Sequence, residues 1–149
     1  MKVSKRVTYG IMAAVDLAIN ARESPVQARA IAKRQGIPVR FLEQVLHALK
    51  NAELVQSHRG AQGGYLLSRE PSSLSIADIL EALEGPVFHR SSVRQGAHDR
   101  SPAKPELLLG DVWDQVQQAE RKVLEGITVE RLATHQQTLD AQQNPMYHI

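Results

Sequence analysis

The sequence contains no cysteine among its 149 residues. Disulfide bonds, thiolate metal ligands and a cysteine nucleophile are therefore excluded. Aromatic residues make up only 4% of the chain, so we expect a core that is aliphatic and mostly helical. No apolar run approaches the roughly 20 residues that cross a bilayer, and no apolar stretch follows the charged N-terminus as it does in a secretory signal. These absences predict a cytoplasmic protein without a membrane partner.

Positive charge is concentrated in the first half of the chain. Positions 1–70 hold 11 Lys and Arg against 5 Asp and Glu, whereas positions 71–149 hold 7 against 11. The two halves carry balances of +6 and −4, which sum to the net charge of +2. A basic half favours contact with a polyanion, although an excess of this size also arises by chance.

Helical periodicity predicts three helices in the basic half. The first covers positions 4–20 with Ser4 as its N-cap, and the second covers 26–35 with Gly36 as a left-handed C-terminal cap. The third runs from Pro38, placed in its first turn, to about Ala52. The second and third helices, joined by a short turn, form a helix-turn-helix.

A glycine-rich hairpin is predicted directly after the third helix. Positions 54–58 and 65–67 read as strands around the turn 59–64. A helix-turn-helix followed by such a hairpin has the outline of a winged helix, whose third helix fits the major groove of DNA. The predicted fold class is therefore mainly α with a small β-hairpin wing, and positions 1–83 form the DNA-binding domain.

The acidic half is predicted to hold a dimerisation element. A fourth helix, 76–83 with Ser75 as its cap, precedes a long flexible loop over 84–106. Positions 107–140 then form a long dimerisation helix, ended by Gly126, and a short terminal helix that reaches about Leu139, while 141–149 form a disordered tail. Apolar residues recur on the long helix with alternating spacings of three and four, which is typical of a helix pair. The predicted homodimer interface is Leu109, Val112, Val116, Ala119 and Val123.

The polar side of the third helix offers candidates for reading bases. Glu43 can accept from a cytosine amine, Gln44 can pair with adenine, and Lys50 suits a phosphate. The same residues could equally form a solvated helix face. The residues not assigned to the core are Arg40, Phe41, Glu43, Gln44, His47, Lys50 and Asn51.

The predicted turn of the hairpin also has a pattern that indicates contact with DNA. Arg59 flanks three glycines, Gly60, Gly63 and Gly64, where a plain turn needs one or two. Glycines let the backbone approach another surface closely, and a cation there suits a narrow minor groove. The pattern favours contact with DNA over a merely structural turn.

Several segments together resemble the Rrf2 family of bacterial winged-helix transcription regulators. They are VSKRVTYGIMAAVDLA, IAKRQGIPVRFLEQVLHALKNAELVQSHRGAQGGYLLSR and SIADILEALEG. The resemblance implies a homodimer on a roughly palindromic operator, with Glu43 reading a base and Arg59 entering the minor groove. It also places Lys5, Arg40 and Gln44 at that interface. The full set expected at DNA is Ser4, Lys5, Arg40, Phe41, Glu43, Gln44, His47, Lys50, Arg59, Gly60, Gly63, Gly64 and Tyr65.

The chain departs from this family at the metal centre. Many members hold an iron–sulfur cluster on three loop cysteines, but this sequence has none, and Gly110 replaces the family's histidine. Clusters are held chiefly by thiolates, so no cofactor and no metal site is predicted. His89, His98 and Asp99 are the residues from which another ligand set could be formed.

No motif for chemistry is found: a P-loop, a G-x-S-x-G and an HExxH are all missing. We therefore expect a DNA-binding regulator and not an enzyme. One alternative keeps DNA binding but senses a small molecule or a partner protein at the loop and the dimerisation helix. Another is an adaptor that has kept the fold and lost DNA binding.

Overall fold

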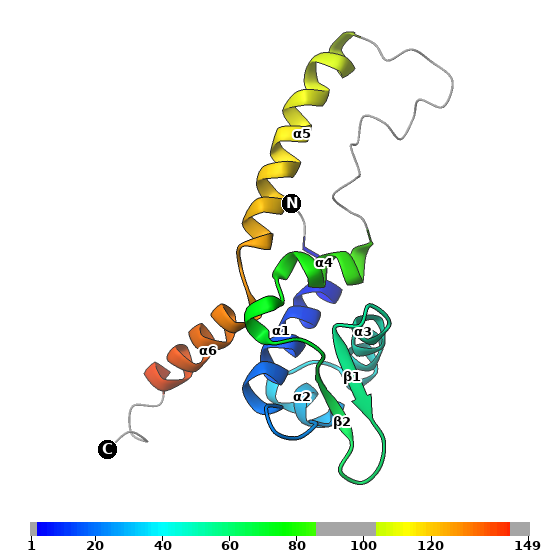
Figure 1. Cartoon of the computed structure of the whole chain (residues 1–149), viewed down its shortest axis with the longest axis vertical. Coiled ribbons are helices and arrows are strands. Elements are labelled where there is room, and N and C mark those ends of the chain that lie inside the picture. Colours follow the sequence, from blue (N-terminus) through cyan, green and yellow to red (C-terminus); the bar gives the residue numbers. More distant parts are fainter. Residues whose placement is uncertain (1–2, 86–103, 144–149) are drawn as a thin grey trace.

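The structure, a computed structural model, describes residues 3–85 and 104–143 (Figure 1). It is mainly α-helical with one two-stranded antiparallel hairpin, as predicted. The elements are α1 (Lys5–Asn20), α2 (Ala28–Gln35), α3 (Val39–Asn51), β1 (Val55–His58), β2 (Gly64–Leu67), the 3-10 turn η1 (Pro71–Ser73), α4 (Ile76–Glu84), α5 (Lys104–Glu125) and α6 (Val129–Gln143). Within the described ranges, no helix combines the length and apolar character needed to span a membrane.

Helix α1 is the centre of the fold. It packs against α2, α3, α4, β2 and α6, and in Figure 1 these elements surround it. Its N-terminus is capped by Ser4, whose hydroxyl accepts the Val7 N–H at 3.2 Å, as predicted. The core around it is aliphatic, because its largest fully buried apolar side chains are all Leu, Ile and Val: Leu17, Ile31, Leu42, Leu46, Leu49, Leu74, Ile79, Val7, Val45, Val55 and Val129.

The turn between α2 and α3 forms where the sequence predicts it. Gly36 has φ 67 and ψ 35, a left-handed conformation that costs little without a Cβ. The Ile37 N–H then donates to the Ala32 carbonyl at 3.0 Å. Pro38 precedes α3 as its N-cap and is not part of its first turn, so that predicted boundary was wrong by one residue.

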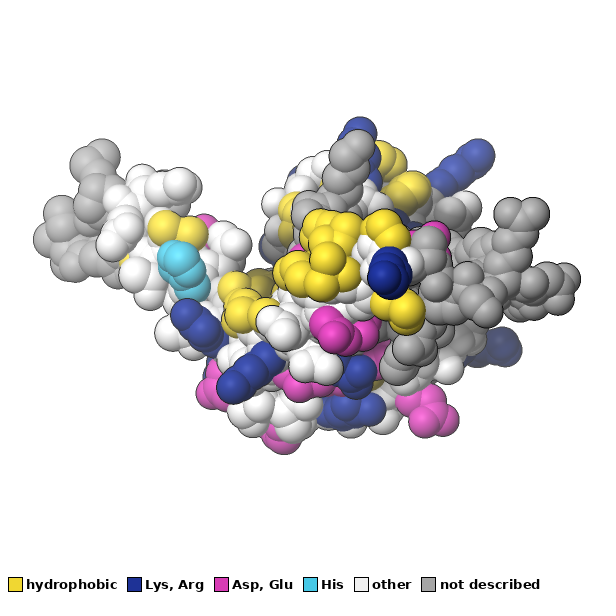
Figure 2. Space-filling model, turned by 90° about the horizontal axis from the view of Figure 1, so that it is seen from above, with side chains coloured by type: hydrophobic (Ala, Val, Ile, Leu, Met, Phe, Trp, Pro, Cys, Tyr) yellow, Lys and Arg dark blue, Asp and Glu magenta, His cyan; other side chains and the backbone are white. Residues whose placement is uncertain are grey.

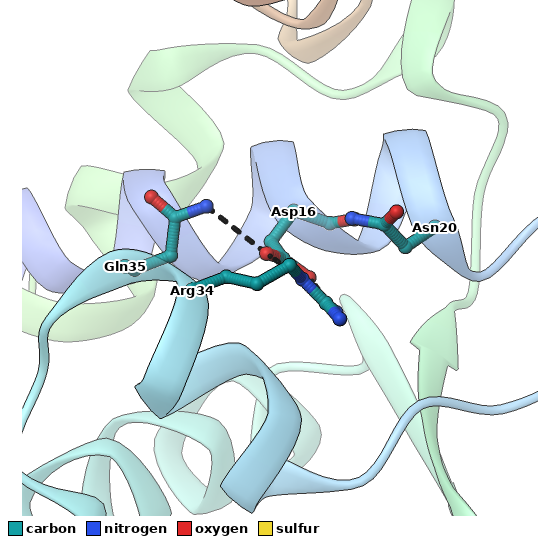
Figure 3. A network of polar contacts seen from close by, with 4 residues as sticks. All are labelled: Asp16, Asn20, Arg34 and Gln35. Carbon is teal, nitrogen blue, oxygen red and sulfur yellow. Dashed lines mark hydrogen bonds and ion pairs between the residues drawn. The ribbon is translucent and has the colours of Figure 1, made fainter.

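A buried charge joins α1 to α2 (Figure 3). Asp16 is fully buried and is the one buried charged side chain within residues 3–85 and 104–143. Arg34 donates to both of its carboxylate oxygens, from Nη2 at 2.7 Å and Nε at 2.9 Å, and Gln35 Nε2 donates at 3.0 Å. The hydrogen bonding of Arg34 to Asp16, together with the carboxylate charge, raises the pKa of Arg34 above its ordinary value. The last turn of α2, immediately before the helix-turn-helix turn, is thereby fixed against α1.

The wing is broader than the sequence indicates, because a third segment pairs with the other edge of β2. Strands β1 and β2 pair from Val55 with Leu67 to His58 with Gly64. Val26 adds a bridge to Tyr65 through two backbone hydrogen bonds of 2.8 and 2.9 Å. The prediction that α2 begins at position 26 was therefore wrong, because the Val26 backbone pairs with the hairpin.

The C-terminal helices leave the body in different directions (Figure 1). Their connection is hydrogen-bonded to the segment before α4: the Ile76 N–H donates to Ile127 O at 2.9 Å, and the Val129 N–H donates to Leu74 O at 2.8 Å. Thr128 caps α6 by accepting the Arg131 N–H at 3.1 Å, as predicted.

Two predicted boundaries in this half were wrong. Helix α6 is 15 residues long, so positions 140–143 continue the helix where its end and a tail were expected. Its first turn is supported because Val129 and Ala133 are buried against the body. Helix α5 begins at Lys104, inside the span predicted as loop. The remainder of that loop, 86–103, and the tail beyond 143 lie outside the described residues.

Replacing Asp16 with Asn removes the carboxylate from beneath Arg34. We expect the free energy of unfolding to fall by about 3 kcal/mol, the lower end for breaking a buried pair, because the half-exposed Arg34 can be rehydrated. Urea unfolding followed by circular dichroism at constant protein concentration measures this. The matched control is Glu125→Gln, which breaks the exposed Arg121–Glu125 pair and should change stability little. Equal effects of the two variants would contradict the importance of the buried pair.

Candidate nucleic-acid interface

Helix α3 presents a polar groove to solvent. Its buried side, Leu42, Val45, Leu46 and Leu49, packs into the core and thereby directs the intervening residues outward. The groove is lined by Arg40, Glu43, Gln44, His47, Ala48 and Asn51 of α3 together with Arg6 of α1. Cationic, carboxylate and amide groups in this arrangement can bind phosphates and base edges.

Arg6 is a residue that the sequence analysis missed. It lies in the second position of α1, yet it lines the groove of α3 because the two helices pack against each other. The basic pair Lys5–Arg6 at the start of a helix was the available signal. Only one of these two side chains can face α3. Which one does so depends on the angle at which α1 and α3 cross, and sequence spacing does not give that angle.

Ser4 and Phe41, both predicted to contact DNA, also have contacts within the protein. The Ser4 hydroxyl caps α1 and also donates to Glu84 Oε1 at 2.5 Å, which ties α1 to the end of α4. Phe41 is half-buried, and its ring meets the ring of Tyr9 edge-on with centroids 5.3 Å apart. Lys5, in contrast, is exposed at the first position of α1.

Lys50 lies apart from the groove. It shares a shallow depression with Glu53 and with residues of β1, including His58. The structure therefore brings Arg40, Glu43, Gln44 and His47 together, but places Lys50 toward the base of the wing.

The wing beside α3 carries the exposed Arg59 (Figure 1). Gly60 next to it has φ +108 and open space around its Cα. The other two glycines have internal roles: a Cβ on Gly63 would collide with the His58 carbonyl oxygen, and a Cβ on Gly64 would collide with the Val26 carbonyl oxygen. Gly63 and Gly64 are therefore required by the hairpin itself, which the sequence analysis did not consider, and the contact of all three glycines with DNA stays a prediction. Tyr65, half-buried, contributes its backbone to the bridge with Val26.

Helix α5 exposes the apolar residues predicted to form a dimer interface. It has no buried residue, and Leu109, Val112, Val116 and Val123 are 45–60% exposed. Ala119 is exposed as well, and Leu107, Leu108 and Trp113 add further apolar surface. Figure 2, seen from the end at which α5 begins, shows hydrophobic side chains gathered there. Soluble proteins rarely leave so large an apolar surface uncovered.

The part of the chain that the structure describes holds no group of three or more His, Asp or Glu side chains suited to a metal ion. His89, His98 and Asp99 lie outside the described residues. Gly110 lies on α5 with open space around its Cα.

Known proteins similar to this chain are DNA-binding regulators. A family model, Rrf2, described as an iron-dependent transcriptional regulator, matches residues 3–135. The HTH-type transcriptional regulator CymR of Bacillus subtilis is 37% identical over 91% of this chain and 91% of its own length. The regulator IscR of Photorhabdus laumondii is 31% identical over 94% of this chain and 84% of its own.

The solved structures agree with the sequence relatives. The structure of CymR, described as the global cysteine regulator of B. subtilis, has a TM-score of 0.72 and 36% identity over 91% of this chain and 98% of that one. These matches confirm the winged-helix prediction and favour a regulator over an adaptor without DNA binding. The chain therefore belongs to the Rrf2 family and is a DNA-binding transcriptional regulator, not an enzyme.

Proposed function

We propose that this regulator acts as a homodimer that binds a roughly palindromic operator through α3 and the wing of each subunit. The groove that α3 forms with Arg6 is the observation that carries the proposal. It combines a cation from a second helix with Glu43 and Gln44, which can discriminate bases. Arg59, exposed at the neighbouring hairpin, reaches toward the minor groove.

The apolar surface of α5 supports the dimer. A helix of 22 residues is about 33 Å long, and its a and d positions are uncovered in the single chain. Pairing two copies about a two-fold axis covers them and presents two α3 helices in opposite orientations. An operator with two-fold symmetry matches this arrangement.

Residues 3–85 and 104–143 offer no ligand set for the iron centre that the family description implies. The sequence supplies no thiolate, and the described His, Asp and Glu residues form no cluster. We therefore propose a regulator without a cysteine-ligated iron–sulfur cluster, whose metal-free form binds the operator.

Binding of the full-length protein to the DNA upstream of its own coding sequence tests this function. Fluorescence anisotropy is measured at two salt concentrations, in metal-chelating buffer and against random competitor DNA. We expect binding that resists the competitor and weakens with salt, because phosphate contacts release counterions. Binding that the competitor abolishes would contradict the proposal.

Substitutions of Glu43 and Arg6 should affect DNA binding in different ways. Glu43→Ala should lower the preference for operator over random DNA by about tenfold to a hundredfold, because a base contact is lost. Arg6→Gln should weaken binding to both DNAs and reduce the slope of log K against log salt by about one, because a phosphate contact is lost. The same anisotropy titrations measure both, and a uniform loss in Glu43→Ala would contradict its role as a base reader.

A charge in the middle of the α5 surface should separate the subunits. Val116→Glu places a carboxylate where a dry helix pair would bury it, so we expect a monomer in sedimentation velocity and a loss of operator binding. Gln118→Glu, an exposed position on the polar side of α5, is the matched control and should stay dimeric. A dimeric Val116→Glu variant would refute the interface.

A further inference from the structure

A cavity of about 630 Å³ lies between α1, the end of β2 with η1, and α6. Its volume is within the range of small-molecule sites, about 300–1,000 Å³. It lies apart from the groove of α3, and no residue of α5 lines it. It therefore shares no residue with the groove of α3 or with the predicted dimer interface.

The floor of the cavity is apolar and is formed by one leucine and two alanines. Leu17, Ala18 and Ala133 line it and are buried beneath the surface. Alanine on both α1 and α6 leaves space that larger side chains would fill. This floor suits an apolar group of a few carbon atoms.

The rim carries charges of both signs. Arg22 and Arg69 contribute two cations, of which Arg69 also pairs at 3.7 Å with Asp78 outside the cavity, and Glu70 and Glu130 contribute two carboxylates. Arg22 is held in place by donating from Nε to the Ala18 carbonyl at 3.3 Å. A rim with equal numbers of positive and negative charges does not favour a polyanion or a polycation. It is complementary to a ligand that carries one positive and one negative charge.

We propose that this cavity binds a free α-amino acid with an apolar side chain. The side chain occupies the floor, the carboxylate pairs with an arginine of the rim, and the ammonium group pairs with a rim glutamate. The hydroxyls of Ser72 and Thr134 line the same opening and can donate to the carboxylate.

The position of the cavity connects it to both functional surfaces. One wall is α6, which follows α5 through the connection that is hydrogen-bonded to Leu74 and Ile76. The opposite wall includes Leu67, which pairs with Val55 at the base of the wing. A ligand that bridges these walls fixes α6, and through the connection also α5, relative to the wing. It changes the operator affinity when it binds the DNA-competent arrangement and the alternative arrangement with different affinities. This regulatory effect, unlike the binding itself, rests on the proposed function.

Isothermal titration calorimetry on the full-length protein tests the binding. The probes are L-leucine, L-methionine and L-phenylalanine, and we expect saturable binding with a Kd of about 1 mM or tighter for at least one. Two analogues of leucine, 4-methylpentanoate without the ammonium and 3-methylbutylamine without the carboxylate, should bind at least about tenfold more weakly, because each loses one charged pair. If none of the three amino acids binds, or if an analogue binds as tightly as leucine, the proposal is overturned.

A cavity-filling variant tests the location. Thr134→Trp places an indole into the opening from an exposed position, so the fold should be retained while amino-acid binding is lost. Thr138→Trp, one turn further along α6 and outside the cavity, is the matched control and should bind as the original protein does. Unchanged binding in Thr134→Trp would overturn the assignment of the site.

Operator titrations with and without the bound amino acid test the coupling. We expect the operator Kd to change by at least about fivefold in the original protein and not in Thr134→Trp. An unchanged operator Kd at saturating amino acid would overturn the coupling and leave the binding result standing. Failure to bind the operator in either condition would instead count against the proposed function.

Discussion

The arrangement of the DNA-facing elements depends on one buried carboxylate. Asp16 accepts three hydrogen bonds from the last turn of α2 in a site from which water is excluded. A buried charge is costly unless it is paired and fully hydrogen-bonded, so alternative positions of α2 that break these bonds are disfavoured. Because α2 leads directly into the turn at Gly36, the same contact limits the positions that α3 can take. Helix α3 is therefore positioned in two ways. The polar contact of Asp16 fixes the preceding helix α2, and the aliphatic side of α3 packs into the core.

The winged helix and the C-terminal helices α5 and α6 are joined by short-range contacts around α1 and α4. The connection between α5 and α6 pairs with the segment before α4, and the first turn of α6 packs on α1. At the other end of α4, Glu84 accepts a hydrogen bond from Ser4, next to the exposed Lys5. Helices α5 and α6 are thus anchored to the same elements that position the groove.

Local signals in the sequence predicted much of this fold. Ser4, Ser75 and Thr128 cap their helices, and Gly36 ends α2, because these effects involve residues within a few positions of one another. The bridge of Val26 to Tyr65 spans 39 positions, so helical periodicity could not reveal it.

In the candidate site, too, the local pattern could be predicted from the sequence, whereas the contacts between distant elements could not. The polar row on α3 follows from its amphipathic pattern, and the structure confirms that it is exposed. The contribution of Arg6 depends on how α1 and α3 cross. The Asp16 network was missed because a single acidic residue in an amphipathic helix looks like a surface residue until its partners on α2 are known.

The two crowded glycines of the wing have a consequence for comparing such regulators. Gly63 and Gly64 face the carbonyl oxygens of His58 and Val26, and any larger residue there would deform the hairpin whether or not it meets DNA. Selection for a folded wing alone would therefore preserve both. Arg59 faces solvent, so only selection for its contact would keep it. In a relative that has exchanged DNA for another partner, the glycine pair should survive and the arginine should drift.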